Sequence, residues 1–306
     1  MIYAMSVMLS NGNGLGLGMK FDLVMWTKNG EEFLPEVLKR IDAAIPYECV
    51  SQKILVDDHS VDRTVEIAED FNWAVYENPS TGISEGANEA LRHVKMPFFM
   101  SFEQDLLLAK DWWSKIPVYL EDPNVAIASG ARLPDKPVGL RKLHYYLVKR
   151  GQGEAFILHK NARARPYRFG KTLDNTAYKT RIIRALGGFP QVIRNSGVDM
   201  LLSYKISEAG FRWIVDYDVL STHLRHGLRS ELRHEEWHGF TSAEISRRIK
   251  QQMGKQLPIT KRSTLFRFLF CPAMGLLIAL TMNEPSIVYI YPLVRLYYVK
   301  GLLKGG

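Results

Sequence analysis

Short apolar runs alternate with segments of helical periodicity over residues 21–128, and this alternation limits the fold more than any other feature. Short, almost continuous apolar runs are typical of buried strands, whereas an apolar repeat every three or four residues is typical of helices. Strands that alternate with helices pair in parallel through right-handed crossovers. We therefore predict an α/β fold with a Rossmann-like, mostly parallel sheet flanked by helices. The runs occupy residues 21–26, 53–57, 73–76, 98–102 and 125–128.

Two carboxylates follow the fourth run directly. Glu103 and Asp105 are separated by one residue, and alternate residues of an extended chain point to the same side. The strand end that carries them is where an open α/β sheet usually binds its ligand. Hard carboxylate oxygens can hold Mg²⁺ or Mn²⁺ and leave coordination positions for substrate phosphates. The spacing therefore suits a metal site, and a solvated acidic strand end is the alternative.

A second pair of acids, Asp57 and Asp58, follows the second run. The carboxyl ends of parallel strands share one edge of the sheet. We therefore expect this pair to converge with the acids after the fourth run. Ser60 follows two residues later and is well placed to cap the helix expected at 61–71.

The chain has 306 residues, which one large or two ordinary domains can fill. Its formal net charge of +8 favours an anionic partner such as phosphate, an acidic membrane face or nucleic acid. Two cysteines form no disulfide framework, so we expect a reducing, cytoplasmic setting. The glycine-rich segment 11–18 precedes the first strand, which argues against a dinucleotide-binding loop. We expect residues 1–19 to form a flexible leader.

The pattern is less regular after residue 130. Residues 141–171 carry many basic and aromatic side chains, which suit either a solvated face or a surface that contacts substrate phosphates. Helical periodicity returns at 176–186 and 199–208, and glycine follows each segment. An apolar run at 211–215 predicts a further strand.

Several motifs, taken in order, resemble those of family 2 glycosyltransferases, which have the GT-A fold. The resemblance implies a GT-A domain over residues 20–240 and a nucleotide-sugar donor as its ligand. The motifs are VDDHSVDRT at 56–64, GISEGAN at 82–88, FEQD at 102–105, GGF at 187–189, VD at 198–199 and the glycine at 210.

The resemblance implies donor-binding roles for five positions. Asp58, the second acid after the second strand, would accept a hydrogen bond from the nucleotide base. Thr27 and Asn29, in the turn after the first strand, would line the same pocket. Gly82 and Asn88 lie where the family packs a helix against the nucleotide.

The resemblance also implies the metal ligands and the general base. Glu103 takes the first acidic place of the D-x-D motif, near the ribose and the metal. Asp105 takes the second place, as the metal ligand that bridges to the diphosphate. Asp199 would be the general base. Family members often place a histidine near the metal or diphosphate at the position of His223, and a structural histidine is the alternative.

These roles imply an inverting glycosyltransferase. A divalent cation neutralises the departing nucleotide diphosphate as a Lewis acid, and a carboxylate takes the proton of an acceptor hydroxyl. One base opposite the leaving group suffices for single displacement with inversion. We expect the acceptor to be lipid-linked or a glycan. We expect no nucleic-acid partner, because no recognition module is visible.

Three positions depart from the family pattern. Glu103 stands where aspartate is usual, Val198 replaces the first acid of a Glu-Asp pair, and Ala87 stands where many members carry arginine. The first two departures favour a second class of function, in which a catalytically degenerate protein binds a nucleotide sugar or a membrane lipid without turnover. Nucleotidyl transfer is less favoured, because the turn at 27–30 is too short to cradle phosphates.

The segment HEEWH at 234–238 matches the H-E-x-x-H pattern of zinc proteases. Two histidines four residues apart share one face of a helix. No third zinc ligand stands out downstream, and we expect Gly239 to interrupt the helix. We therefore interpret the match as chance.

Residues 241–306 are expected to form a basic and hydrophobic tail. Its two apolar runs, 268–282 and 287–303, are broken by prolines and Arg295 and fall short of the ~18–20 uncharged residues of a spanning helix. They suit a helical hairpin on the cytoplasmic face of the cell membrane, with tyrosines at the headgroup level. The preceding basic residues suit an anionic membrane surface. Two helices packed over the protein core are the alternative.

Overall fold

The computed structural model describes residues 20–157, 171–191, 197–224, 227–254, 265–266 and 268–305. The expected leader, 1–19, lies outside these residues, as does the part of the basic stretch from 158 to 170. The chain divides into two compact units. The first comprises Met1–Arg132, Ile157–Gln191 and Val198–His223, and the second comprises Leu133–Phe156, Val192–Gly197 and Leu224–Gly306.

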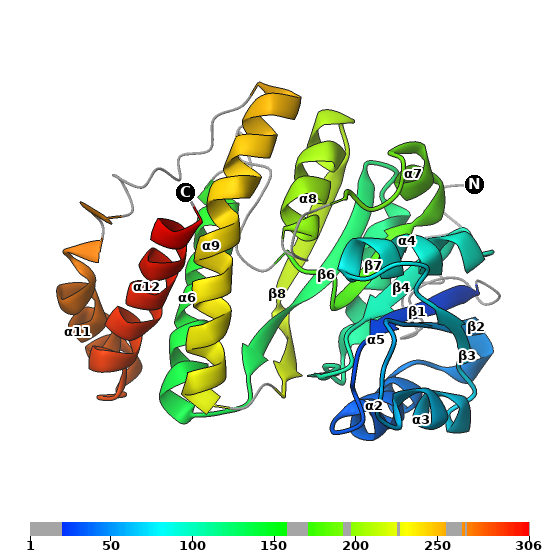
Figure 1. Ribbon diagram of the computed structural model, residues 1–306, viewed down its shortest axis with the longest axis horizontal. Coiled ribbons are helices and arrows are strands. Elements are labelled where there is room, and N and C mark those ends of the chain that lie inside the picture. The colour runs from blue at the N-terminus through cyan, green and yellow to red at the C-terminus, as the bar shows by residue number, and fades with distance from the viewer. Residues whose placement is uncertain are drawn as a thin grey trace, which may run out of the picture. The chain divides into compact units, whose positions relative to one another are not determined.

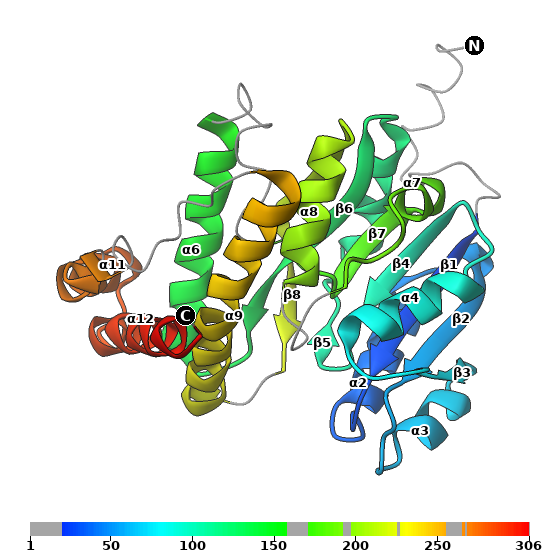
Figure 2. The same cartoon turned by 45° about the horizontal axis from the view of Figure 1, so that its top comes forward.

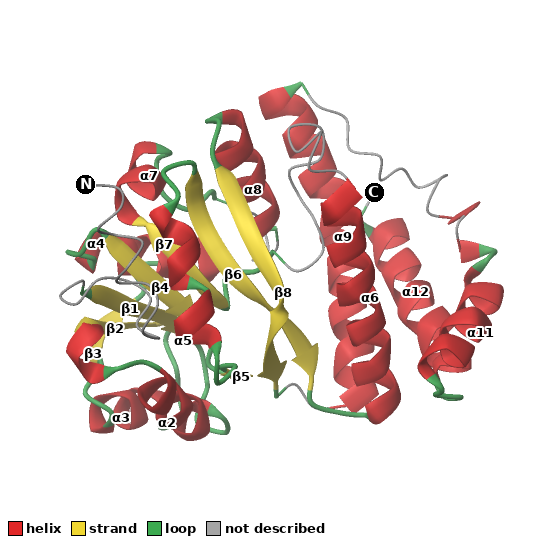
Figure 3. Cartoon of the chain, turned by 180° about the vertical axis from the view of Figure 1, so that it is seen from behind, coloured by secondary structure: helices red, strands yellow, loops and turns green. Residues whose placement is uncertain are grey.

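An eight-stranded sheet with the order β3-β2-β1-β4-β7-β6-β8-β5 forms the centre of the first unit (Figure 1). β1 pairs in parallel with β2 and β4, and β2 pairs in parallel with β3, which confirms the Rossmann-like arrangement. β7 is antiparallel to β4 and β6, and β5 is antiparallel to β8. Figure 3 shows the long strands β6 and β8 side by side. The strands are β1 Phe21–Thr27, β2 Val50–Asp57, β3 Ala74–Glu77, β4 Phe98–Phe102, β5 Leu106–Leu107, β6 Val125–Pro134, β7 Asn175–Lys179 and β8 Arg212–His223.

Helices pack against the parallel strands, and the central strand β1 is fully covered. All seven residues of β1 are buried. Helix α4 packs against β1 and β2, as Figure 2 shows. A Cβ atom at Gly86 of α4 would lie 3.0 Å from the Trp26 Cβ, so the glycine permits this close packing. The helices of this unit are α2 Leu34–Ala44, α3 Thr64–Asp70, α4 Ile83–His93, α5 Trp112–Lys115, α7 Thr180–Ala185 and α8 Val198–Glu208, with 3-10 helices η2 Tyr47–Cys49 and η3 Pro117–Glu121.

The carboxyl ends of β1, β2 and β4 lie at the same edge of the sheet. In the register of the sheet, Thr27 is opposite Asp57 and Met25 is opposite Phe102. The loops that leave these three strands therefore start close together, where a ligand site is expected in an open α/β sheet.

The prediction that Ser60 caps a helix is wrong. Helix α3 begins only at Thr64 and has no side-chain cap. The Ser60 hydroxyl instead accepts a hydrogen bond from the Asn29 amide at 2.8 Å. The Thr64 amide donates to the Asp62 carboxylate at 3.0 Å. The Ser60 hydroxyl, which the sequence predicted to cap the helix, thus binds the loop after β1 and not the helix.

The second unit is built from helices, including α6 Val138–Ile157, α9 Gly227–Met253, α11 Cys271–Met282 and α12 Ile287–Lys304. α12 packs against α9 on one side and α11 on the other (Figure 1). This packing confirms the C-terminal hydrophobic helical hairpin. No helix in the described ranges is both long enough and apolar enough to cross a membrane. A buried cluster joins α6, α11 and α12 through Leu140, Leu143, Ile278, Ala279, Ile287, Ile290 and Val294.

The prediction that Gly239 interrupts a helix is also wrong, because α9 continues through it. A Cβ atom at Gly239 would lie 1.9 Å from the Tyr298 carbonyl oxygen of α12. A Cβ atom at Gly301 would lie 1.8 Å from the Glu236 carbonyl oxygen. These glycines let the backbones of α9 and α12 approach closely, and this packing outweighs the weak helix propensity of glycine.

Candidate functional site

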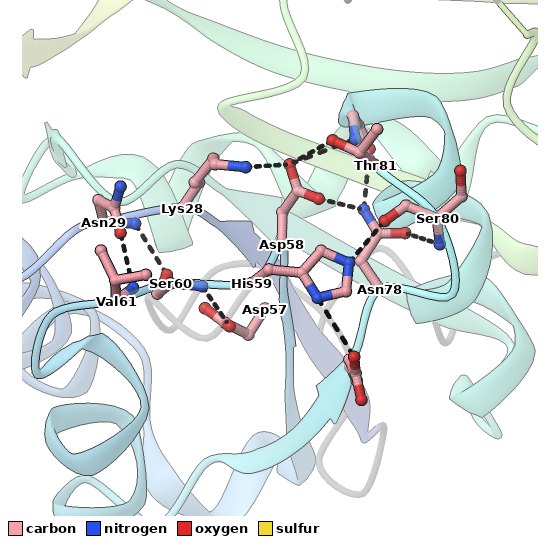
Figure 4. A network of polar contacts seen from close by, with 12 residues as sticks. Lys28, Asn29, Asp57, Asp58, His59, Ser60, Val61, Asn78, Ser80 and Thr81 are labelled. Atoms are coloured by element: carbon pink, nitrogen blue, oxygen red, sulfur yellow. Dashed lines mark hydrogen bonds and ion pairs between the residues drawn. The ribbon is translucent and has the colours of Figure 1, made fainter.

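One cluster of polar contacts surrounds Asp58, directly after β2 (Figure 4). Its carboxylate accepts hydrogen bonds from Thr81 Oγ1 at 3.1 Å, the Gly82 amide at 3.3 Å and Asn78 Nδ2 at 3.3 Å. Lys28 Nζ lies 3.5 Å from the same carboxylate. The loops after β1 and β3 therefore both hold Asp58 in place.

Gly82 is fixed by its backbone conformation at the start of α4. Its φ of 103° favours glycine, and a side chain would be strained there. Its amide donates to Asp58, and its carbonyl oxygen accepts from Asn78 Nδ2 at 3.2 Å. Gly82 therefore shapes the loop that holds Asp58. A contact of Gly82 with the donor stays a prediction.

The turn after β1 holds the loop after β2. Asn29 has a left-handed φ of 49°, its Oδ1 accepts from the Val61 amide at 2.9 Å, and its own amide donates to Ser60. The Thr27 carbonyl oxygen accepts from the Asp58 amide at 2.8 Å. The Thr27 hydroxyl is buried and has no hydrogen-bond partner within the described ranges. Both predicted residues thus adjoin the loop of Asp58, and their contact with a base stays a prediction.

Asn88 on α4 makes its hydrogen bonds within the protein. Its Oδ1 accepts from the Phe189 amide at 2.8 Å, and its Nδ2 donates to the carbonyl oxygens of Phe189 and Ser84, both at 2.9 Å. A Cβ atom at Gly188 would lie 2.3 Å from Asn88 Oδ1. The GISEGAN and GGF motifs therefore hold each other together. A donor contact by Asn88 stays a prediction.

A second cluster brings Glu103, Asp105 and His223 together. One ligand atom of each residue lies within 4.8 Å of the others. His223 Nε2 lies 3.5 Å from Asp105 Oδ1 and 3.9 Å from Glu103 Oε2. β8 extends past the strand expected at 211–215 and ends at His223, which pairs with Leu106 of β5. Two carboxylates and an imidazole form a donor set that fits Mn²⁺ or Mg²⁺.

Gln104 links this cluster to the Asp58 cluster. Its Oε1 accepts from the Lys28 amide at 2.8 Å, and its Nε2 donates to the Lys28 carbonyl oxygen at 3.0 Å. The ammonium group of Lys28 in turn pairs with Asp58. Lys28 therefore connects Asp58 to Gln104, the residue between Glu103 and Asp105.

No sequence motif points to Arg132 or Asp174. Arg132 on β6 donates to Asp174, and its Nη1 lies 3.5 Å from Glu103 Oε2. Asp174 is fully buried and also accepts from Thr172 Oγ1 at 2.5 Å and Asn175 Nδ2 at 2.8 Å. The one available signal is an arginine within an apolar strand, because a charged residue there needs a partner.

Asp199 lies in the first turn of α8. Burial raises the pKa of Asp199 to about 6, against the lowering effects of a hydrogen bond from the Met200 amide and of the Arg132 charge. The charge of Asp174 adds to the increase. A carboxylate with this pKa can accept a proton near neutral pH. Arg132 therefore couples Asp199 electrostatically to Glu103 of the Glu103–Asp105–His223 cluster.

The H-E-x-x-H segment lies on α9. The rings of His234 and His238 have centroids 4.1 Å apart. Glu236 pairs with Lys300 at 2.8 Å and with Lys304 at 2.6 Å. This glutamate therefore joins α9 to α12 through ion pairs.

Comparison with known proteins identifies one family. The family model described as glycosyl transferase family 2 matches residues 22–186. A search of curated proteins gives no match.

Several solved structures are similar to this chain. A mannosyltransferase from Pyrobaculum calidifontis, in complex with GDP-Man and Mn²⁺, is 17% identical with a TM-score of 0.61 and covers 99% of this chain and 94% of that one. S. aureus TarS with UDP-GlcNAc is 13% identical with a TM-score of 0.53, over 93% and 91% of the two chains. Glucosyl-3-phosphoglycerate synthase from Mycobacterium tuberculosis, with Mn²⁺ and UDP, is 13% identical with a TM-score of 0.51, over 74% and 80%. At these identities the likeness shows the fold.

Proposed function

This chain belongs to glycosyl transferase family 2, and we propose that it transfers a sugar from a nucleotide-diphosphate-sugar donor to a hydroxyl group of a lipid-linked or glycan acceptor. The proposal depends above all on the Glu103–Asp105–His223 cluster, which shares Arg132 with Asp199. This reaction has two requirements: a group of ligands that can hold a cation, and a carboxylate that can accept a proton.

Glu103, Asp105 and His223 would hold a divalent cation. Their donor atoms suit Mn²⁺ or Mg²⁺, and two similar structures contain Mn²⁺. When bound, the cation supplies the positive charge that neutralises the departing diphosphate. His223 is buried and its strand is paired to β5, so the imidazole is held in a fixed position beside the two acids.

The Asp58 cluster would bind the nucleotide. An ionised carboxylate accepts hydrogen bonds from the N–H groups of a base, and such charge-assisted bonds are strong. The buried Thr27 hydroxyl, on the strand next to Asp58, offers a further group for the same ligand. GDP-Man, UDP-GlcNAc and UDP are bound in similar structures, which supports a nucleoside diphosphate as the ligand of the Asp58 cluster.

Asp199 would remove the proton of the acceptor hydroxyl as that oxygen attacks the anomeric carbon. The bond to the diphosphate breaks on the opposite face, so the configuration inverts in one displacement. Arg132 lowers the pKa of Asp199, and this keeps more of the carboxylate ionised near neutral pH. The positive charge of Arg132 also offsets repulsion between Glu103 and the other acids.

A thermal-shift assay tests the cation and donor site. Mn²⁺ with GDP or UDP should raise the melting temperature of the wild-type protein by roughly 5 °C at saturating ligand, because binding stabilises the folded state. Asp105→Ala should abolish the shift. Asp111→Ala is the matched control, because Asp111 is a half-exposed acid paired with Lys115. An equal shift in wild type and Asp105→Ala would refute the assignment, and transfer with retained configuration would refute single displacement.

A further inference from the structure

We propose that the α11–α12 hairpin docks on an anionic lipid bilayer through the outer apolar face of α11. The observations that support this come from the second unit and are independent of the transfer site.

Helix α11 has no polar face, although half of it is exposed. Its 12 residues, CPAMGLLIALTM, include no charged side chain. Leu276, Leu277 and Leu280 are 51%, 54% and 73% exposed, on the side opposite the buried residues. A helix that is apolar all round is normally buried in protein or in lipid. The buried side, which packs into the helices of this unit, consists of Cys271, Gly275, Ile278 and Ala279.

The exposed apolar surface continues beyond α11. Phe266, Leu269 and Phe270 precede the helix and are exposed, and so is Tyr289 on α12. Single exposed apolar residues are normal, but a run of them along one segment marks an interaction surface. Aromatic side chains beside exposed leucines suit the boundary between lipid headgroups and acyl chains.

The positive charge of the chain is concentrated in the same region. Residues 224–306 contain thirteen Lys or Arg and five Glu, so their formal net charge of +8 equals that of the whole chain, and residues 1–223 have no net charge. Apolar insertion combined with cations near the phosphates is how peripheral helices bind anionic lipid. A second copy of this chain would bring two regions of the same strong positive charge together, which favours lipid as the occupant.

The geometry fits a helix that lies in the membrane surface. At 12 residues, α11 is about 18 Å long, shorter than the ~30 Å hydrocarbon core. Asn283 turns the chain with a left-handed φ of 47°, and α12 then carries Arg295, Lys300 and Lys304. These charges keep α12 near the headgroups, so the inserted part is the outer face of α11.

Vesicle flotation tests this surface with the full-length protein and without donor or acceptor, so its result does not depend on the transferase proposal. Wild type should float with phosphatidylcholine vesicles that contain phosphatidylglycerol, and about tenfold less with pure phosphatidylcholine. The double variant Leu277→Glu/Leu280→Glu should lose roughly tenfold or more of the binding. Tyr47→Glu, at an 85% exposed apolar residue of the first unit, should bind like wild type.

A melting temperature for each variant shows whether that variant is folded. A higher salt concentration should release wild type from the anionic vesicles, because salt screens the attraction between the basic residues and the lipid headgroups. Three results would overturn the proposal. The first is that wild type does not float with anionic vesicles, and the second is that Tyr47→Glu loses as much binding as the double variant. The third is that wild type sediments as a dimer, the double variant sediments as a monomer, and neither protein binds vesicles. The last result would identify a second copy as the occupant.

Discussion

The Asp58 cluster and the Glu103–Asp105–His223 cluster lie at one sheet but are assembled differently. The partners of Asp58 lie 20 to 30 residues away in sequence, in the loops after β1 and β3. Glu103 and Asp105 lie in the turn between β4 and β5, His223 ends β8, and their neighbour Arg132 comes from β6. The first cluster is therefore closed by short loops, and the second depends on the whole sheet.

The two clusters also differ in charge. Neutral groups donate three hydrogen bonds to the Asp58 carboxylate, and Lys28, the cation that pairs with it, is half exposed. Arg132, by contrast, forms ion pairs with Glu103 and Asp174, and its charge lowers the pKa of Asp199 at longer range. An excess of acids around one guanidinium is suited to receive a cation. Charge changes in the second cluster should therefore affect turnover and its pH dependence, whereas a charge change at Asp58 should affect donor binding, and the following experiments test that difference.

The largest effect is expected for Asp199→Asn, which removes the proposed base. The turnover number should fall by roughly 10³-fold, within the usual range for general-base catalysis. Steady-state kinetics with a nucleotide-sugar donor would measure this fall. Glu208→Gln, at the other end of α8, is the matched control and should retain the wild-type rate. A turnover number for Asp199→Asn within threefold of wild type would exclude Asp199 as the base.

The same variant should be more stable than wild type above pH 6. The pKa of Asp199 is raised from 3.8 to about 6, so the folded protein holds the proton more tightly than the unfolded chain does. Stability therefore falls as pH rises from about 4 to about 6. Asp199→Asn removes this penalty and should gain about 1–2 kcal/mol at pH 8, measured by urea unfolding. If Asp199→Asn had a lower free energy of unfolding than wild type at pH 8, the ionised Asp199 carboxylate would not destabilise the folded protein, contrary to this prediction.

A smaller effect is expected for Asp58→Ala in the other cluster. The loss of a charge-assisted hydrogen bond to the base should raise the donor KM by roughly 10- to 100-fold. The turnover number should change much less, because the reacting atoms lie elsewhere. Glu77→Ala is the control, since Glu77 is exposed and pairs with His59 on the neighbouring loop. If turnover fell as far as in Asp199→Asn, the division between a binding cluster and a reacting cluster would not hold.

The smallest effect on turnover is expected for Arg132→Met, although the loss of the cation that pairs with buried Asp174 should also lower the free energy of unfolding. Because the Arg132 charge lowers the pKa of Asp199, its removal should shift the acidic limb of the pH–rate profile upward by roughly half a pH unit. Mn²⁺ should bind more tightly, because a positive charge beside Glu103 is lost; titration calorimetry would measure this. Arg212→Met, at an arginine paired with Asp122, is the control. An unchanged limb together with unchanged Mn²⁺ affinity would remove Arg132 from the site.

The sequence predicted those features of the structure that depend on residues close together in the chain. Apolar runs predicted the parallel strands, and the Glu-x-Asp spacing predicted that Glu103 and Asp105 lie close together after one strand. A turn, in which the Leu106 amide donates to the Glu103 carbonyl oxygen at 3.3 Å, brings them together in place of the expected extended chain. Predictions based on one residue and its local propensity were wrong where a distant segment competed. Ser60 bonds to the loop after β1, and Gly239 lies against α12.

The order of apolar and polar residues determined the parallel strands and the edge of the sheet at which Asp58, Glu103 and Asp105 lie, because backbone periodicity and strand spacing are local properties. The antiparallel strand β7 was not predicted, because it occupies part of the segment 176–186 that was expected to be helical. Only the tertiary structure decided which charges act together. Arg132 and Asp174 have no recognisable motif, and they matter because the fold places them beside Glu103 and near Asp199. Burial strengthens interactions between charges, and it arises only when distant segments exclude water together.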